Sequence, residues 1–382
     1  MAPEGGAPAP QARTVPALSF LAVIQTAART CGVTRLADIT GLDRIGFPVW
    51  QAVRPAGRAL SVHQGKGATP LDAQIGALCE AVESDCAERV PVDGPHCAHA
   101  ELPPGACEAD VTDFLDRRDI TDDATQPIGW CLARDLVSGA EQLLPHAVVS
   151  LDYTIAELGP FDRSSTGLAV GTSEDEALHA ALLEVIERDA VGEWERSGAA
   201  ARMATSVPLD SIALPWLDRW QDRLAACRTS LAVHAPPAVV DAPVLVCTLD
   251  GPAEFGGERR SAMGSAAHPD PEVALFRAFA EAVQSRLTLI AGVRDDIMPG
   301  HYRTQSGRGP LVPPTPRGFP CRRWSEIRSG PASLQLLIHA LAERGYRRIV
   351  AKRLGEDLAG VHVAKVFVPG LGSAHRTRRR PR

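Results

Sequence analysis

The sequence lacks the apolar runs and the N-terminal signal that direct a protein into or across a membrane. No apolar stretch reaches the roughly 20 residues of a membrane-spanning helix. The opening MAPEGGAPAPQARTVP has no basic start followed by an apolar run, so we interpret residues 1–16 as a disordered tail rather than a signal peptide. These absences predict a cytoplasmic protein without a membrane partner.

The sequence also lacks a strong charge of either sign and any C-x-x-C pair. A formal net charge of −6 over 382 residues argues against nucleic-acid binding. The nine cysteines are scattered, which favours reduced thiols over a disulfide framework. His96, Cys97, His99 and Cys107 lie close together, but their spacing fits no standard zinc module. Both interpretations stay open there, a surface loop, which we favour, or a zinc site.

Aromatic residues are few, at 5%, whereas 33 glycines and 31 prolines indicate many loops. An apolar share of 45% nevertheless allows a substantial core. Apolar periodicity and capping residues predict helices at 17–31, after Thr69, after Ser173, after Asp270 and at 332–345. Strands are expected at 146–156, 242–250, 347–354 and 360–370, and a turn of small residues at 165–172.

The most informative feature is a helical segment that recurs in three places. The copies read GATPLDAQIGALCEAVE, GTSEDEALHAALLEVIE and HPDPEVALFRAFAEAVQ, and they begin at residues 67, 171 and 268. They align without a gap and end in Glu80 and Glu83, in Glu184 and Glu187, and in Glu281 and Gln284. This predicts three related turn–helix units beside strands, unless Ala/Leu/Glu-rich helices resemble one another by chance.

Paired glutamates at i and i+3 share one face of a helix, and here they are surrounded by apolar residues. Buried carboxylates repel one another unless a cation neutralises them, and Mg²⁺ prefers a few carboxylates together with phosphate oxygens. Two acid pairs that face each other therefore predict a cage for Mg²⁺ on a nucleotide triphosphate. The segment GKGAT lacks the Walker-A spacing, so cations for the phosphates are sought in Lys66, Arg188, Arg277 and Arg286.

With these motifs the chain resembles the YcaO superfamily of ATP-dependent enzymes that activate peptide backbone amides. The resemblance is carried by LDRIGFPVWQAVRP, LSVHQGKGATPLDAQIGALCEAVE, STGLAVGTSEDEALHAALLEVIERDA and HPDPEVALFRAFAEAVQSRLTLIAGVRDD. Together these stretches cover most of residues 35–298, with a weaker match in VHVAKVFVPGL. The resemblance implies an α+β, YcaO-like fold in which the three units surround a nucleotide site, with residues 17–370 as a single catalytic domain and 371–382 as a basic tail.

The resemblance also implies roles for individual residues. The metal-binding acids of the family correspond to Glu80, Glu83, Glu184 and Glu187. Nucleotide contacts are implied for Lys66, Ser165, Thr166, Arg188, Arg277, Glu281 and Gln284. Catalytic roles are implied for Arg188, Arg277, Glu281 and Arg286. The chain departs from the family at Thr166, where the motif usually reads Ser-Asn-Gly, and at Gly76, where Ser is usual.

The implied reaction is ATP-dependent phosphorylation of an amide oxygen in a ribosomal peptide, followed by attack of a nucleophile on the carbonyl carbon. Because the nucleophile need not come from the enzyme, we expect His179 to be a packed core histidine and Cys79 a buried structural thiol. Thioamide formation with a separate TfuA-type partner is slightly favoured. The alternatives are azoline formation with an E1-like partner and a non-catalytic peptide-binding scaffold. A precursor peptide is the expected substrate, and a homodimer stays open.

Overall fold

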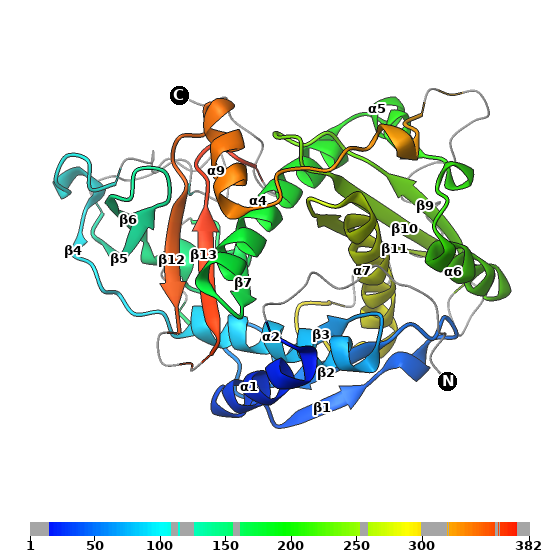
Figure 1. The fold of residues 1–382 in the computed structure, drawn as a ribbon. Coiled ribbons are helices and arrows are strands. Elements are labelled where there is room, and N and C mark those ends of the chain that lie inside the picture. The colour runs from blue at the N-terminus through cyan, green and yellow to red at the C-terminus, as the bar shows by residue number, and fades with distance from the viewer. Residues whose placement is uncertain are drawn as a thin grey trace.

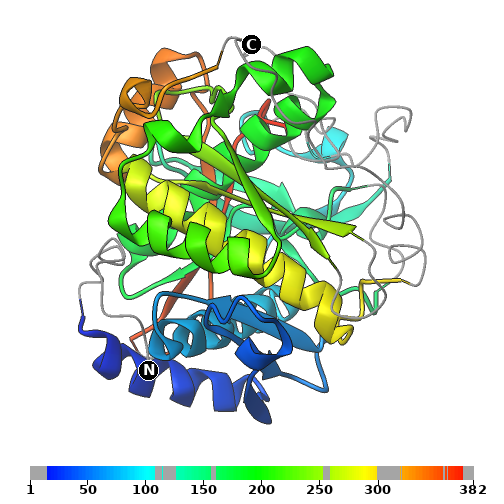
Figure 2. The ribbon, with the colours of Figure 1, turned by 90° about the vertical axis from the view of Figure 1, so that its right-hand side faces the viewer.

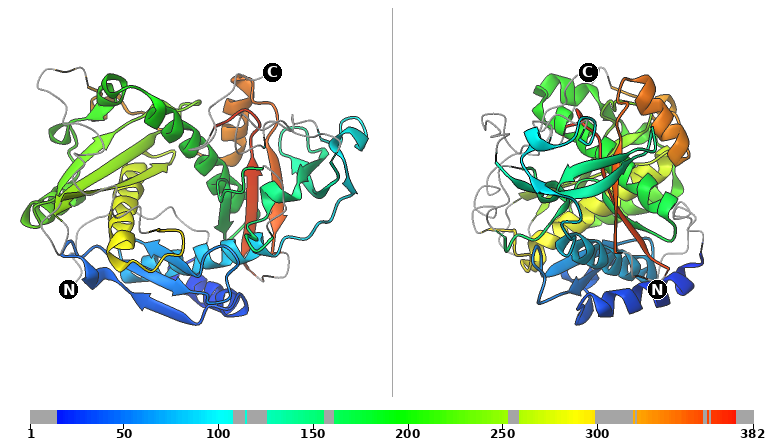
Figure 3. Two further views of the ribbon diagram at one scale, coloured as in Figure 1. Left: turned by 180° about the vertical axis from the view of Figure 1, so that it is seen from behind. Right: turned by 90° about the vertical axis from the view of Figure 1, so that its left-hand side faces the viewer.

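The computed structural model of the chain describes residues 15–107, 114, 126–155, 161–252, 259–298, 319, 321–355, 358 and 360–372. Most of the two predicted tails, residues 1–14 and 373–382, lies outside this range. Within it, three groups of strands and helices surround a common centre (Figure 1), and the view from behind shows the same ring (Figure 3). No helix of the described part is both long and apolar enough to span a membrane. The single domain predicted over 17–370 stays a prediction.

The first group is an antiparallel sheet with two helices, and it forms the base of the molecule (Figure 2). Its elements are α1 (Ala17–Thr30), β1 (Arg35–Asp38), β2 (Val49–Val53), β3 (Val62–Lys66) and α2 (Pro70–Glu88). The strand order is β1-β2-β3, and α2 packs on β2 and β3. Gly65 makes this packing close, because a Cβ there would lie 2.0 Å from Ala73 O.

The second group is a six-stranded sheet of order β4-β5-β12-β13-β7, with β6 paired to β5. The strands are β4 (His96–Cys97), β5 (Ile128–Asp135), β6 (Glu141–Pro145), β7 (Leu168–Gly171), β12 (Val350–Leu354) and β13 (His362–Phe367). The helices are α3 (His146–Val149), α4 (Glu174–Arg196) and α9 (Leu334–Glu343). Helix α4 packs on β7 and β13.

The third group is a four-stranded sheet of order β11-β10-β9-β8, with α7 (Pro271–Ala291) packed on β10 and β11. The strands are β8 (Ser206–Val207), β9 (Ser230–His234), β10 (Val244–Pro252) and β11 (Arg259–Ala267). Two further helices, α5 (Ala199–Ala204) and α6 (Pro215–Ala226), precede β9. An aromatic cluster that includes Phe47, Trp216 and Phe279 joins this group to the first one.

The three sequence repeats are three strand–turn–helix units, β3–α2, β7–α4 and β11–α7. Each helix begins directly after the aligned residue Thr69, Ser173 or Asp270, whose side chain accepts a hydrogen bond from an N–H of the first turn. One turn later, the aligned alanines that face the strands are completely buried. The predicted repeat and the mixed α+β class are therefore confirmed.

The last residue of each repeat ties its helix to the strand of the next unit. The bonds run from Val170 N–H to Glu83 (2.8 Å), from Ala267 N–H to Glu187 (3.2 Å) and from the Gln284 side chain to Gln64 O (3.5 Å). The third bond returns to the first unit and closes the ring.

Two local predictions are wrong. Residues 146–149 form helix α3 rather than the start of a strand, and residues 150–155 form no strand. There Asp152 accepts a hydrogen bond from Thr154 N–H (3.0 Å), a local turn that replaces strand pairing. The predicted turn at 165–172 contains the short strand β7, which becomes a strand by pairing with β13.

Candidate functional site

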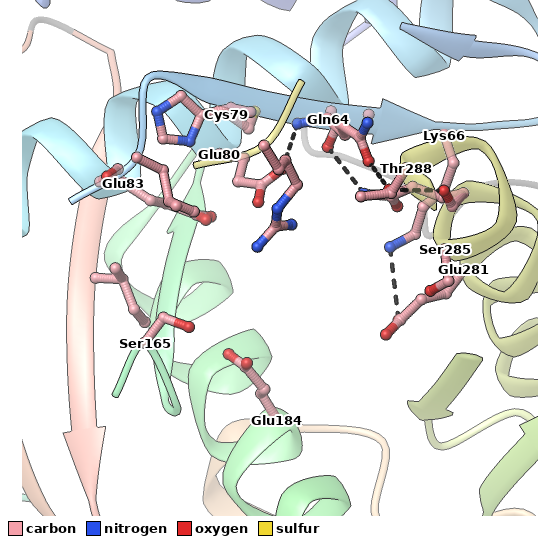
Figure 4. Close-up of a pocket in the computed structure, with 18 of the residues that line it drawn as sticks. Gln64, Lys66, Cys79, Glu80, Glu83, Ser165, Glu184, Glu281, Ser285 and Thr288 are labelled. Atoms are coloured by element: carbon pink, nitrogen blue, oxygen red, sulfur yellow. Dashed lines mark hydrogen bonds and ion pairs between the residues drawn. The ribbon is translucent and has the colours of Figure 1, made fainter. Parts of the chain in front are cut away.

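A cavity of about 1240 Å³ lies where the three units meet. It is lined by residues of β3 and α2, of β7 and α4, and of β11 and α7. Figure 4 shows Glu83, Glu184 and Glu281 extending toward this space from three different helices. The volume exceeds that of a typical small-ligand pocket, so the cavity has room for a nucleotide and part of a second ligand.

Most of the residues that the sequence indicates as functional line this cavity. They are Lys66, Glu80, Glu83, Ser165, Glu184, Arg188, Arg277, Glu281 and Gln284. The repeat explains this convergence, because equivalent positions in three units arranged as a ring face the same centre. Residues that lie 97 to 201 positions apart in the sequence, such as Glu80, Glu184 and Glu281, thereby share one cavity.

The two acids of α2 are fixed by main-chain donors. Glu80 accepts a hydrogen bond from Gln64 N–H (2.7 Å) and Glu83 accepts one from Val170 N–H (2.8 Å). Burial raises the pKa of both carboxyl groups, and the neighbouring Glu184 and Glu80 raise that of Glu83 further. Without a cation, this part of the cavity therefore favours protonated glutamates.

On α4, Glu184 faces Arg188, with 3.5 Å between Glu184 Oε1 and Arg188 Nε. Burial raises the pKa of Glu184 to about 7, although Arg188 lowers it. Burial alone would lower the pKa of Arg188, but the carboxylates of Glu187, Glu184 and Glu281 raise it above its usual range. Arg188 is thus a permanent cation, and 39% of its side chain is exposed.

Further cations stand around the same space. Lys66 Nζ lies 3.6 Å from Glu281 Oε2, and both side chains are partly exposed. Arg277 lines the cavity from α7, and Arg294 lines it from the segment after that helix. The cavity therefore offers both carboxylate oxygens and guanidinium or ammonium groups, which together suit a metal ion on a phosphate chain.

The described residues contain no group of three or more His, Cys, Asp or Glu that converges closely enough to hold a metal ion. The expected cage of four glutamates is therefore not formed as a cluster. The donor set still fits Mg²⁺, which commonly takes one or two carboxylates and completes its shell with phosphate oxygens and water.

Three of the residues indicated by the sequence lie outside the lining of this cavity. Glu187 is buried against β11, where it accepts hydrogen bonds from the Ser265 hydroxyl (2.7 Å) and from Ala267 N–H (3.2 Å). Arg286 is buried and pairs with Asp43 (2.7 Å). Thr166 lines a separate small cavity next to β13.

Sequence reasoning did not single out several residues of the cavity wall. Gln64 hydrogen-bonds the Thr288 hydroxyl through its side chain, and Arg294 pairs with Asp296 (2.6 Å). Ser285 also belongs to the lining (Figure 4). Gln64 and Arg294 lie just outside the repeated stretches, so the alignment that reveals Glu80 gives no signal for them.

The remaining candidates fit structural roles. His179 and Cys79 are buried, as expected. His99 packs on Trp130, with 5.8 Å between the ring centroids. Among the described residues, the side chains of His96, Cys97, His99 and Cys107 form no group that could hold a metal ion. His96 and Cys97 lie in the short strand β4 rather than in a loop.

The fold and the cavity define an α+β protein whose centre suits a complex of a metal ion and a nucleotide. The family model described as "YcaO cyclodehydratase", ATP- and Mg²⁺-binding, matches residues 64–372. The chain therefore belongs to the YcaO family.

Similar proteins agree with this assignment. An uncharacterized protein in the tfuA 3′ region of Rhizobium leguminosarum bv. trifolii is 30% identical over 93% of this chain and 87% of its own length. YcaO from Methanopyrus kandleri, solved with AMPPCP and Mg²⁺, superposes with a TM-score of 0.72 at 21% identity over 97% of this chain and 96% of that one. A heterocyclase solved with substrate and cofactor gives a TM-score of 0.79 at 20% identity, and this chain, covered to 96%, spans 54% of it. The two solved structures share the fold.

Proposed function

We propose that the chain uses Mg²⁺ and ATP in the central cavity to phosphorylate a backbone amide oxygen of a ribosomal peptide. The observation that carries this proposal is the convergence of carboxylates and cations from three repeats on one cavity, in a member of an ATP- and Mg²⁺-binding family. ATP supplies the phosphoryl group, which makes the amide oxygen a good leaving group.

The charge of each cavity residue suggests its role in the proposed reaction. Glu80, Glu83 and Glu184 are the proposed metal ligands, because all three line the cavity and burial raises their pKa values, so that a bound cation would stabilise their ionised forms. Arg188, Arg277 and Lys66 are the proposed phosphate-binding cations. Ser165, Glu281 and Gln284 line the same space and are the proposed nucleotide-positioning residues.

The residues outside the cavity need different roles. Glu187 joins α4 to β11, and we propose that it positions Glu184 and Arg188 on the same helix. Arg286 would act through the placement of α7, since it is bound to Asp43. A nucleotide contact of Thr166 would require access from the main cavity through Ser165, its neighbour in the chain.

We propose a thioamide as the product, formed when a sulfur nucleophile from outside attacks the activated carbonyl carbon. The similarity to a protein in a tfuA region supports a TfuA-type partner that presents the precursor peptide in the cytoplasm. The second candidate is azoline formation by a Cys, Ser or Thr of the peptide with an E1-like partner. It is favoured by the cyclodehydratase description of the family.

The mass of the product separates these reactions. The full chain is incubated with ATP, Mg²⁺, sulfide, a TfuA-type partner protein and a candidate precursor peptide. Replacement of one oxygen by sulfur supports thioamidation. A sulfide-independent loss of water that needs a Cys, Ser or Thr of the peptide supports azoline formation. An unchanged peptide mass without ATP consumption would overturn both and leave a non-catalytic binding scaffold.

A further inference from the structure

One edge of the four-stranded sheet is open and turned toward the centre of the molecule (Figure 1). This edge belongs to β11, whose other edge pairs with β10 along its whole length. Ala267 N–H donates to Glu187 and not to β10. Because main-chain groups alternate in an antiparallel ladder, every second residue before Ala267, including Ser261 and Met263, also directs its N–H and C=O away from β10.

Ser261 and Met263 line the central cavity, and both are partly exposed. Their main-chain groups on the open edge have no hydrogen-bond partner in the described part of the chain. The Ser261 hydroxyl is bound to Asp250 (3.0 Å), so it does not cover the edge. The cavity wall therefore contains two adjacent main-chain sites that are ready to pair with an extended chain.

The other two units differ at this point. On β3, Gln64 N–H donates to Glu80 and Gln64 O accepts from Gln284. On β7, Val170 N–H donates to Glu83. Side chains thus occupy main-chain groups of these two strands, whereas on β11 the side chain of Glu187 reaches only the far end, beyond Met263. The open edge of β11 is the best place in the cavity for strand pairing.

We propose that the peptide substrate binds as an added β-strand on this edge, through hydrogen bonds to the main chain of Ser261 and Met263. The identity of this occupant rests on the proposed function, which requires a peptide inside the cavity. Pairing through the main chain recognises an extended peptide with little regard to its side chains, which suits an enzyme that modifies the backbone itself.

Strand pairing also orients the reacting group. Carbonyl groups of successive residues in a strand point to opposite edges, so a residue between two paired ones directs its C=O away from β11 and into the cavity. The strand lies directly against the part of α7 that carries Glu281, since a Cβ on Gly264 would be 2.6 Å from Glu281 C. An amide held in this way faces the proposed nucleotide site.

The first test removes the N–H of Met263 without disturbing the hydrogen bonds between β10 and β11. In Met263→Pro, the ring replaces a donor that points away from β10, a position where an edge strand tolerates proline. Met263→Ala is the matched control, because it shortens the side chain and keeps the N–H. We expect Met263→Pro to raise the Kd of a fluorescein-labelled peptide of alternating threonine and glycine about tenfold relative to Met263→Ala, as judged by anisotropy. Equal Kd values in all three proteins would overturn the proposal.

The second test uses the wild-type chain and therefore does not depend on the folding of a variant. N-methylation of every second residue of the probe leaves one hydrogen-bonding edge intact, whereas N-methylation of every residue removes both. We expect the first peptide to bind about as well as the unmethylated probe and the second to lose at least about tenfold in affinity. Similar affinities of both methylated peptides would overturn strand pairing.

Both tests measure peptide binding without ATP, so their outcome is separable from that of the proposed reaction. If the peptide methylated at every second residue binds like the unmethylated probe and no ATP is consumed, the edge is supported as a docking site and the proposed function is refuted. If Met263→Pro instead modifies the precursor peptide with an unchanged KM, the proposed function stands and the docking site is refuted.

Discussion

Glu184→Gln should stabilise the metal-free protein and at the same time abolish Mg·ATP turnover. Burial raises the pKa of Glu184 from 4.5 to about 7 in the folded chain, although Arg188 opposes the shift. In the unfolded chain the carboxyl group ionises near its ordinary value. The folded state therefore binds more protons between these two pH values, and the free energy of unfolding of the wild type falls as the pH rises through this window.

The size of the effect follows from the same two values. A shift from 4.5 to about 7 corresponds to about 3 kcal/mol at pH 8. With 23% of the Glu184 side chain exposed, we expect the neutral glutamine to recover about 1–3 kcal/mol at pH 8 and almost nothing at pH 4. Removal of this charge also lowers the pKa of Glu83, because Glu184 is one of the groups that raise it.

Urea unfolding in EDTA at pH 4 and pH 8 measures this difference, and ATP hydrolysis with Mg²⁺ measures the loss of function. Glu195→Gln is the matched control, since Glu195 lies exposed on the same helix and outside the cavity lining. We expect the control to change the stability at pH 8 by only a few tenths of a kcal/mol. A Glu184→Gln protein that is no more stable than the wild type at pH 8, or that hydrolyses ATP normally, would refute the reasoning.

Other substitutions test separate parts of the site. Arg277→Ala should weaken nucleotide binding about tenfold or more by calorimetry, because it removes a cation from the cavity wall. Substitution of the exposed Arg35 of β1 by alanine should leave the affinity unchanged. Arg286→Ala should lower the free energy of unfolding by about 3–5 kcal/mol, since it leaves Asp43 buried without its partner, and normal stability would contradict that pairing. Glu80→Gln should abolish ATP hydrolysis while the circular dichroism spectrum stays native, and retained hydrolysis would remove Glu80 from the proposed metal ligands.

Local signals in the sequence were sufficient to predict the helices that build the site. Thr69, Ser173 and Asp270 cap helices where the sequence places their starts, because a cap is a contact between residues only two or three positions apart. The aligned acids on these helices could be recognised for the same reason. Strand β7 could not, since its four residues become a strand only through pairing with β13, almost 200 residues later in the chain.

The sequence also did not reveal which group each acid would contact, because each contact involves a strand that is distant in the sequence. Nothing near Glu187 in the sequence shows that Ser265 and Ala267 will occupy its two oxygens. The cage of four equivalent glutamates was a reasonable expectation from spacing alone. It stays a prediction, but the structure separates Glu187 from the other three, because residues three apart on a helix diverge enough for Glu184 to face the cavity while Glu187 reaches β11.

This divergence explains why the acid–x–x–acid spacing recurs. In each unit the first acid, Glu80, Glu184 or Glu281, lines the cavity. The residue three positions later bonds the next strand, and of these residues Glu83 and Gln284 also line the cavity. The one position without an acid supports this division. Gln284 donates to a carbonyl oxygen, Gln64 O, which a carboxylate could not do because it has no hydrogen to donate. A carboxylate could accept from the Gln64 N–H, but this group already donates to Glu80. The amide of Gln284 thus closes the ring of three units and adds no further negative charge to the cavity. The replacement of an acid by Gln284 in the third repeat therefore follows from the arrangement of the units in a ring.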